Sequence, residues 1–134
     1  GSADVSFVGQ PPRTLNQKMN LPNKLFESIM AGVPVVVSEG NEQCRLTSEE
    51  RIGACVDIDD PAAIAAACAE LLTAPAEDRR ALRDHCRQTA LDKYTWDHTA
   101  VGLVELYRRL ARGGSASAGR SIREGASPRG GGDA

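Results

Sequence analysis

The sequence lacks any apolar run long enough to cross a bilayer, which takes about 20 consecutive apolar residues. Its first residues also lack the basic segment followed by an apolar core that marks a secretory leader. We therefore expect a cytoplasmic protein without a transmembrane segment, and a peripheral attachment of the full-length protein to a membrane stays compatible with this sequence.

An excess of positive charge is also missing. The formal net charge is -2, and charged residues make up 25% of the chain against 41% hydrophobic ones. A nucleic-acid-binding surface is therefore not indicated, and the composition is that of an ordinary soluble domain. A chain of 134 residues allows one such domain.

Metal-binding and redox motifs are absent as well. The four cysteines, at positions 44, 55, 68 and 86, form no Cys-x-x-Cys pair, and we expect free thiols that act as small buried hydrophobes. The two histidines, His85 and His98, lie on different predicted helices without a supporting pair of ligands. We expect neither a metal site nor a cofactor.

The most informative segment that is present covers residues 21–37. Pro22 suits the start of a helix, with Asn20 or Asn23 able to cap it, and Gly32 suits its end. Apolar residues recur every three or four positions, so they form one buried stripe, and Glu27 falls off its centre. The valines at positions 33 to 37, around Pro34, predict a strand covered on both faces, as in a parallel sheet.

Alternation predicts an earlier strand over residues 4–8, followed by a long loop over 9–21. Later patterns predict a short helix, a third strand and three further helices, over 42–50, 52–58, 61–73, 75–93 and 96–112. Asp60 and Pro61 are placed to start the helix that follows the third strand. Trp96 and Tyr107 on the last helix are expected to be core anchors. In such a sheet the loops after the strands form the ligand-binding edge.

The remaining residues, 113–134, hold 7 of the 13 glycines together with serines and arginines. Such a segment cannot bury enough apolar surface to order itself, and we expect a disordered Gly/Ser/Arg tail. The predicted domain boundary therefore lies at residue 112. The fold class is α/β, a partial Rossmann-like parallel sheet of about three strands with flanking helices.

Two stretches in this order, Pro-Asn-Lys-Leu-Phe-Glu (22–27) and Met-Ala-Gly-Val-Pro-Val-Val-Val (30–37), resemble the nucleotide-sugar motif of family-four (group 1) glycosyltransferases of the GT-B fold. The resemblance extends from about residue 3 to residue 112, because the segments 57–61 and 94–97 also occur at these places in such enzymes. It implies the second half of the C-terminal, donor-binding domain. It also implies a hexosyltransferase-type enzyme that moves a sugar from a nucleotide-diphosphate sugar to an acceptor, with retention of configuration. Separately, the bias of the composition toward alanine, glycine and arginine suggests a bacterial source.

The resemblance implies roles for particular residues. Glu27 matches the family's second motif glutamate, which is associated with the ribose hydroxyls, and the amide of Asn23 with the ammonium of Lys24 would meet the diphosphate. Met19 stands where the family's first glutamate, associated with the donor sugar, is expected, so sugar positioning departs from the pattern. The other candidate donor-loop residues are Asn20, Leu21, Ser38 and Gly40. No catalytic residue is assigned, and the family needs no metal.

In the family the three predicted strands would be the last three of their sheet. The acceptor domain and the upstream half of the donor domain would then be missing partners, and we expect this piece to be inactive alone. The alternative is a non-catalytic Rossmann-like module that binds a nucleotide or a protein, which the methionine at position 19 favours. Another GT-B member, such as a nucleotide-sugar epimerase, is a third interpretation.

Overall fold

The computed structural model describes residues 3–114. The chain divides into two compact units, residues 1–95 and 96–134. The first unit holds three strands and five helices, and the described part of the second is one helix. In chain order the elements are β1 (Ser6–Val8), α1 (Leu15–Met19), α2 (Asn23–Met30), β2 (Val35–Ser38), α3 (Glu42–Glu50), β3 (Gly53–Val56), α4 (Pro61–Thr73), α5 (Ala76–Lys93) and α6 (Trp96–Gly114).

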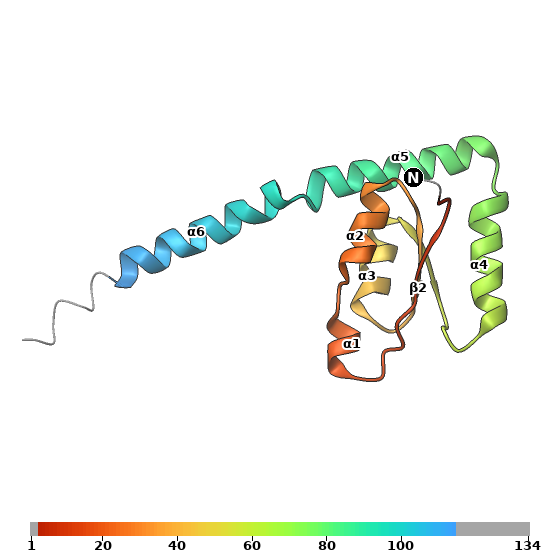
Figure 1. Cartoon of the computed structure of the whole chain (residues 1–134), viewed down its shortest axis with the longest axis horizontal. Helices are drawn as coiled ribbons and strands as arrows, with labels where there is room; N and C mark the ends of the chain where they lie inside the picture. Colours follow the sequence, from red (N-terminus) through yellow and green to blue (C-terminus); the bar gives the residue numbers. More distant parts are fainter. Residues whose placement is uncertain (1–2, 115–134) are drawn as a thin grey trace, which may run out of the picture. The chain divides into compact units, whose positions relative to one another are not determined.

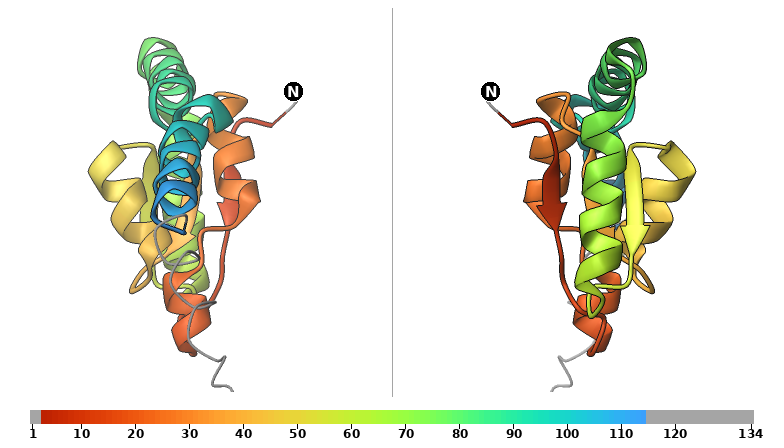
Figure 2. Two further views of the ribbon diagram at one scale, coloured as in Figure 1. Left: turned by 90° about the vertical axis from the view of Figure 1, so that its left-hand side faces the viewer. Right: turned by 90° about the vertical axis from the view of Figure 1, so that its right-hand side faces the viewer.

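The sheet is parallel, with the strand order β1-β2-β3, as the sequence predicts. Val35 at the start of the central strand pairs with Ser6 on one side and Gly53 on the other. All four residues of β2 are buried, which explains the unbroken β-branched run: a central strand covered on both faces needs apolar side chains on both. Figure 2 shows β1 and β3 on either side of α4, pointing the same way.

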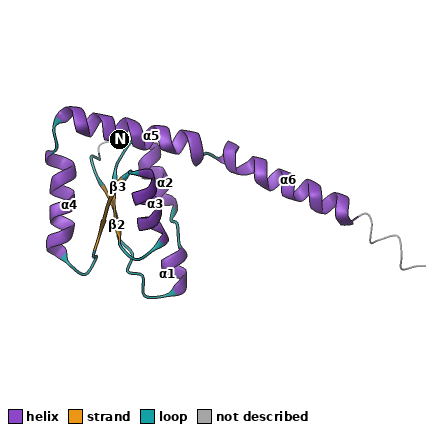
Figure 3. Ribbon diagram, turned by 180° about the vertical axis from the view of Figure 1, so that it is seen from behind, coloured by secondary structure: helices purple, strands orange, loops and turns teal. Residues whose placement is uncertain are grey.

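Helices cover both faces of the sheet. In Figures 1 and 3, α2 and α3 lie on one face, α4 lies on the other, and α5 runs across the end where the strands begin. The strands end at the opposite edge, which we call the carboxyl edge. The helix α1 and the first turns of α2, α3 and α4 lie at this edge. This arrangement is that of a partial Rossmann-like domain.

The core confirms the predicted stripe of α2. Leu25 and Ile29 are fully buried against Val35 and Val37 of the sheet, and Phe26 and Met30 pack at the margin of this cluster. The ring of Phe26 lies 5.3 Å from that of Tyr94, which follows α5, centroid to centroid. Cys86 and Ala90 of α5 complete the cluster, so α2 packs between the sheet and α5.

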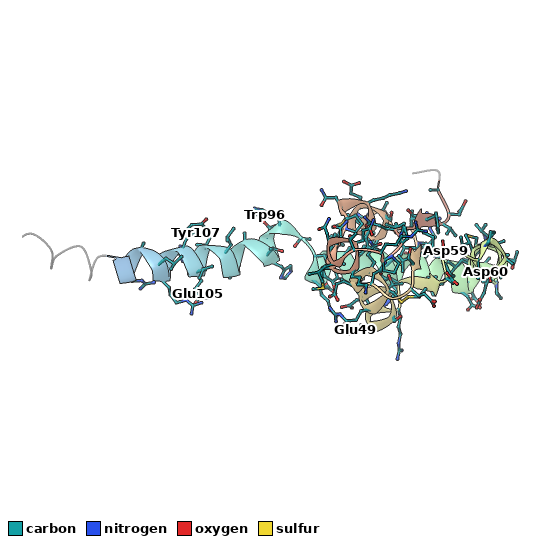
Figure 4. The ribbon with its side chains drawn as sticks, turned by 90° about the horizontal axis from the view of Figure 1, so that it is seen from below. Glu49, Asp59, Asp60, Trp96, Glu105 and Tyr107 are labelled. Atoms are coloured by element: carbon teal, nitrogen blue, oxygen red, sulfur yellow. A yellow bond between two sulfur atoms is a disulfide. The ribbon has the colours of Figure 1, made fainter. Side chains whose placement is uncertain are left out.

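The observed helix ends agree with those predicted from the sequence at two places, and the structure differs from the prediction at two others. Gly32 has φ +69°, the left-handed conformation that ends α2, and Asp60 accepts bonds from the amides of Ala62 and Ala63, at 2.8 and 3.2 Å, to start α4. Figure 4 marks Asp59 and Asp60 at this turn. The segment 9–21 is not all loop, however, because it contains α1. At the start of α1 the Thr14 side chain accepts from the amide of Gln17, and the Gln17 side chain accepts from the amide of Thr14.

The expected cap of α2 by Asn20 or Asn23 is wrong. Pro22 is the N-cap residue and makes no side-chain bond to the first turn, while Asn20 ends α1 and Asn23 is the first residue of α2. The proline ring has no hydrogen-bonding atom in its side chain. The first amides of α2 are therefore not satisfied by a capping side chain.

Free thiols at all four cysteines are also a wrong expectation. Cys44 on α3 and Cys55 on β3 form a disulfide, with their Cα atoms 5.5 Å apart, whereas Cys68 and Cys86 are free. The pairing arises because α3 packs directly on β3, a contact that a spacing of 11 residues does not reveal. Cys86 behaves as predicted, since it is fully buried and burial raises the pKa of its thiol to about 11.

In the second unit, α6 carries its apolar residues on one side. Trp96 and Tyr107 project from one side of the helix and Glu105 from the other (Figure 4). Trp96 is 70% exposed and Tyr107 64%, so among the described residues neither is a core anchor, contrary to expectation. A helical stripe predicts an apolar face but not what covers it. The helix continues to Gly114, and the rest of the predicted tail, 115–134, lies outside the described residues.

Candidate functional site

The candidate residues gather at the carboxyl edge. Asn23 and Lys24 form the first turn of α2, which directly follows the segment Met19 to Pro22, and Ser38 and Gly40 follow or end β2 at the same edge. Glu27 lies one turn further along α2. Crevices outside the carboxyl ends of parallel strands are where open α/β sheets bind their ligands.

Lys24 is tied to the end of β1. Its ammonium donates to the backbone oxygen of Phe7 at 2.9 Å. One bond leaves two of the three N–H donors of the ammonium available. The positive charge is therefore held beside the start of α2, where the unsatisfied amides and the helix dipole already favour an anion.

Glu27 is exposed, and its carboxylate has no hydrogen bond or ion pair within residues 3–114. It borders a shallow hollow of about 270 Å³ that lies between α2 and the segment at the start of β1, with Val33 also in its lining. Ser28 stands beside it, donating to the backbone oxygen of Lys24 at 2.7 Å and lying 2.8 Å from the hydroxyl of Ser6. The hollow thus has polar atoms on its α2 side and small apolar residues, such as Val5, on its floor.

The candidate donor-loop residues have unequal surroundings. Met19 is 65% exposed and Gly40, with φ +73°, is also exposed. Leu21 instead packs against the core, and Ser38 is fully buried with its hydroxyl accepting from the amide of Gln10 at 2.8 Å. Leu21 and Ser38 therefore hold the loop in place. Met19, Asn20 and Gly40 are the members of this set that reach the surface of the loop.

Sequence reasoning missed two residues of this edge, Gln10 and Gln43. Their side chains meet, with the Nε2 of Gln43 donating to the Oε1 of Gln10 at 3.4 Å. Gln43 is fully buried although it lies in the first turn of a polar helix. The one available signal was the position of Gln10, directly after a strand and a glycine, where loops at the functional edge begin.

Shifted pKa values occur elsewhere. Glu50, at the end of α3, accepts from the ammonium of Lys93 at 2.7 Å and from the hydroxyl of Tyr94 at 2.9 Å. The bond from Lys93 holds the pKa of this carboxyl below its usual value, partly opposed by burial. Burial, followed by the bond to Glu50, raises the pKa of Tyr94 to about 12. This cluster joins α3 to the end of α5 and has a structural role.

Two further findings concern the described residues alone. They contain no group of three or more His, Cys, Asp or Glu residues placed to hold a metal ion. They also contain no helix that is both long and apolar enough to span a membrane.

Comparisons with known proteins point to one family. A family described as glycosyl transferase-like matches residues 3–105. The D-inositol 3-phosphate glycosyltransferase of Corynebacterium urealyticum is 37% identical over 85 residues, which are 63% of this chain. The chain spans only 20% of that relative's length. No solved structure matches.

The match covers both the sheet and the motif at 22–37, and it confirms the resemblance on which the sequence interpretation rests. The parallel sheet with helices on both faces is the fold that this family predicts for the piece. The chain belongs to the glycosyl transferase-like family and corresponds to part of a group 1 glycosyltransferase.

Proposed function

We propose that this chain supplies part of the donor site of an enzyme that transfers a sugar from a nucleotide-diphosphate sugar to an acceptor. The observation that supports it is the carboxylate of Glu27, which has no partner within residues 3–114 and is exposed beside a hollow, one turn from Lys24 at the start of α2. A structural carboxylate in this chain looks different: Glu50 has two side-chain donors.

In this proposal each residue has one task. The two oxygens of Glu27 accept hydrogen bonds from the two neighbouring ribose hydroxyls. The amide of Asn23 and the ammonium of Lys24 bind the diphosphate, which gains negative charge as its bond to the anomeric carbon breaks. The dipole of α2 adds to this stabilisation. The proposed site contains no metal ion, because amides and an ammonium carry the positive charge.

The rest of the site would come from the parts of the protein that correspond to the remaining length of the relative. Among the described strands, one side of β1 is unpaired and offers backbone donors and acceptors to a further parallel strand. We place the upstream half of the donor domain there, and an acceptor domain beyond it. Retention of configuration and a cytoplasmic location are further parts of the proposal.

The test is calorimetric titration of the chain with UDP, GDP and ADP. The proposal predicts that one nucleotide binds and that Glu27→Ala weakens it by about 1.5–3 kcal/mol, the usual value of a charged hydrogen-bond partner. The matched control is Glu70→Ala, which removes an exposed carboxylate from α4 and should leave the affinity unchanged. Equal affinity of the wild-type chain and Glu27→Ala would refute the role of Glu27.

A further inference from the structure

Four hydrogen bonds meet at Gln10, the second residue after β1. Its amide donates to the hydroxyl of Ser38 at 2.8 Å, and its backbone oxygen accepts from the Nδ2 of Asn41 at 3.4 Å. Its side-chain Oε1 accepts from Asn20 at 3.1 Å and from Gln43 at 3.4 Å. The residue therefore connects the end of β2, the first turn of α3 and the segment that leads into α2.

The partners of Gln10 are largely buried, which makes the cluster sensitive to change. Ser38 and Gln43 are fully buried, and Asn41 is 8% exposed. The Oε1 of Gln43 has no partner among the described residues, so its Nε2 bond to Gln10 is the side chain's one link. Removing a partner from a buried amide is costly, because the amide has also lost its water.

Asn20 links the cluster at Gln10 to the start of α2. Only Leu21 and Pro22 separate it from Asn23, whose amide is among those that no side chain caps. The bond between Asn20 and Gln10 joins residues ten positions apart, so it closes the whole segment that contains α1. The direction in which the chain enters α2 is thus fixed by one side-chain oxygen and by the packing of Leu21.

We propose that Gln10 is a positioning residue for nucleotide binding, acting through Asn20 on the first turn of α2. This inference rests on the proposed function and adds a residue to it. Gln10 does not touch the diphosphate; it holds the segment 20–23 in the conformation in which the amides of α2 and Lys24 converge. A site that is already in its bound conformation binds more tightly, because no ordering remains to be done.

The test compares Gln10→Leu with Gln10→Glu. Both variants keep the backbone bonds to Ser38 and Asn41, but only glutamate keeps a side-chain acceptor for Asn20 and Gln43. We expect Gln10→Leu to weaken binding of the nucleotide diphosphate about tenfold. Gln10→Glu adds a negative charge that itself disfavours the diphosphate, so this variant is read by amide exchange and not by affinity. Amide exchange at residues 20–23 should become faster in Gln10→Leu and stay slow in Gln10→Glu.

Asn20→Ala gives a second way to break the same bond without disturbing the buried Gln43. It should weaken nucleotide binding as Gln10→Leu does, and the double variant should be little worse than either single one. Additive losses would show that Gln10 acts by general destabilisation and would overturn the proposal. So would unchanged affinity or unchanged exchange in Gln10→Leu, while Glu27→Ala still weakens binding. Absence of nucleotide binding in the folded wild-type chain would overturn the proposed function and this inference together.

Discussion

Two helical glutamates show how surroundings separate a structural carboxylate from a candidate ligand-binding one. Glu50 has a side chain 16% exposed and is bonded to Lys93 and Tyr94. Glu27 is exposed and has no such partner within the described part of the chain. Since burial without partners is unfavourable for a carboxylate, and a partner fixes its orientation, the first suits stability and the second suits a ligand.

For Glu50 we predict a pH-dependent contribution to stability. Because the bond from Lys93 lowers its pKa below the ordinary value of 4.5, its contribution is fully present above that value and is lost as the pH falls through the lowered pKa. Glu50→Gln should be less stable than wild type by about 1 kcal/mol at pH 7, and the difference should shrink as the pH falls below 4.5. Urea denaturation across this range measures it.

The neighbouring Glu49→Gln is the control, because Glu49 is 58% exposed and pairs with Arg45 on the surface of α3. It should change the free energy of unfolding by less than about 0.5 kcal/mol. A difference between Glu50→Gln and wild type that is the same at pH 3 and pH 7 would contradict the role given to its charge. Tyr94 acts in the opposite direction: its raised pKa makes stability fall as the pH rises from about 10 to about 12.

Gly53, at the start of β3, is required by close approach rather than by its backbone angle. A Cβ built there would overlap the backbone oxygen of Val35 on the central strand. We predict that Gly53→Ala lowers the free energy of unfolding by about 3 kcal/mol or more, since neither strand can move without breaking the ladder. Denaturation monitored by circular dichroism measures the loss.

Gly102→Ala is the matched control for this substitution. A Cβ at this exposed position in α6 meets nothing within 4 Å. Alanine should therefore stabilise the helix by its higher helix propensity alone, which is worth about 0.5–1 kcal/mol. Equal effects of the two substitutions would show that the contact at Gly53 does not constrain the sheet.

At the scale of elements, the disulfide between Cys44 and Cys55 links the first turn of α3 to β3. It closes a loop whose ends are 11 residues apart, and we predict that Cys55→Ser, or a reductant, lowers the stability of the first unit by about 2–3 kcal/mol. Cys68→Ser, which changes a free cysteine on α4, should have little effect. Four reactive thiols in the denatured, unreduced chain would contradict the pairing.

Elements whose signals are local were predictable from the sequence. The valine run of β2, the stripe of α2 and its end at Gly32 each depend on a few adjacent residues, and the structure has all three. Helix α1 was missed because prolines and amides in 9–21 favour a loop, and its capping pair, Thr14 and Gln17, was the only contrary sign.

Features that depend on contacts between distant segments were not predictable. The disulfide requires α3 to pack on β3, and the burial of Ser38 requires the loop after β1 to cross the end of β2. For the candidate site, the sequence placed Asn23, Lys24 and Glu27 on one helix start, but it did not reveal the cluster at Gln10, which reaches the segment before α2 through Asn20. The exposed face of α6 likewise could not be assigned a partner from its own residues.

At the scale of the whole molecule, the sheet has two unpaired sides and the relative is far longer than this chain. In our proposal the residues that correspond to the upstream part of the relative pair with the free side of β1 and complete the site near Glu27. The proposed donor site is consequently divided between this chain and the rest, with the ribose and diphosphate contacts on this side. We expect nucleotide binding, and not sugar transfer, from the chain alone.

Because the proposed site is divided in this way, the decisive measurement is an amide chemical-shift titration of the chain alone. The titrants are UDP, GDP and ADP, and the titration is repeated on Glu27→Ala. If the donor site is where we place it, one nucleotide shifts the amides of residues 23–27 in the wild-type chain, and the variant needs a much higher concentration of that nucleotide for the same shifts. A dispersed spectrum in which these amides stay unmoved by all three nucleotides would contradict a donor site at the start of α2.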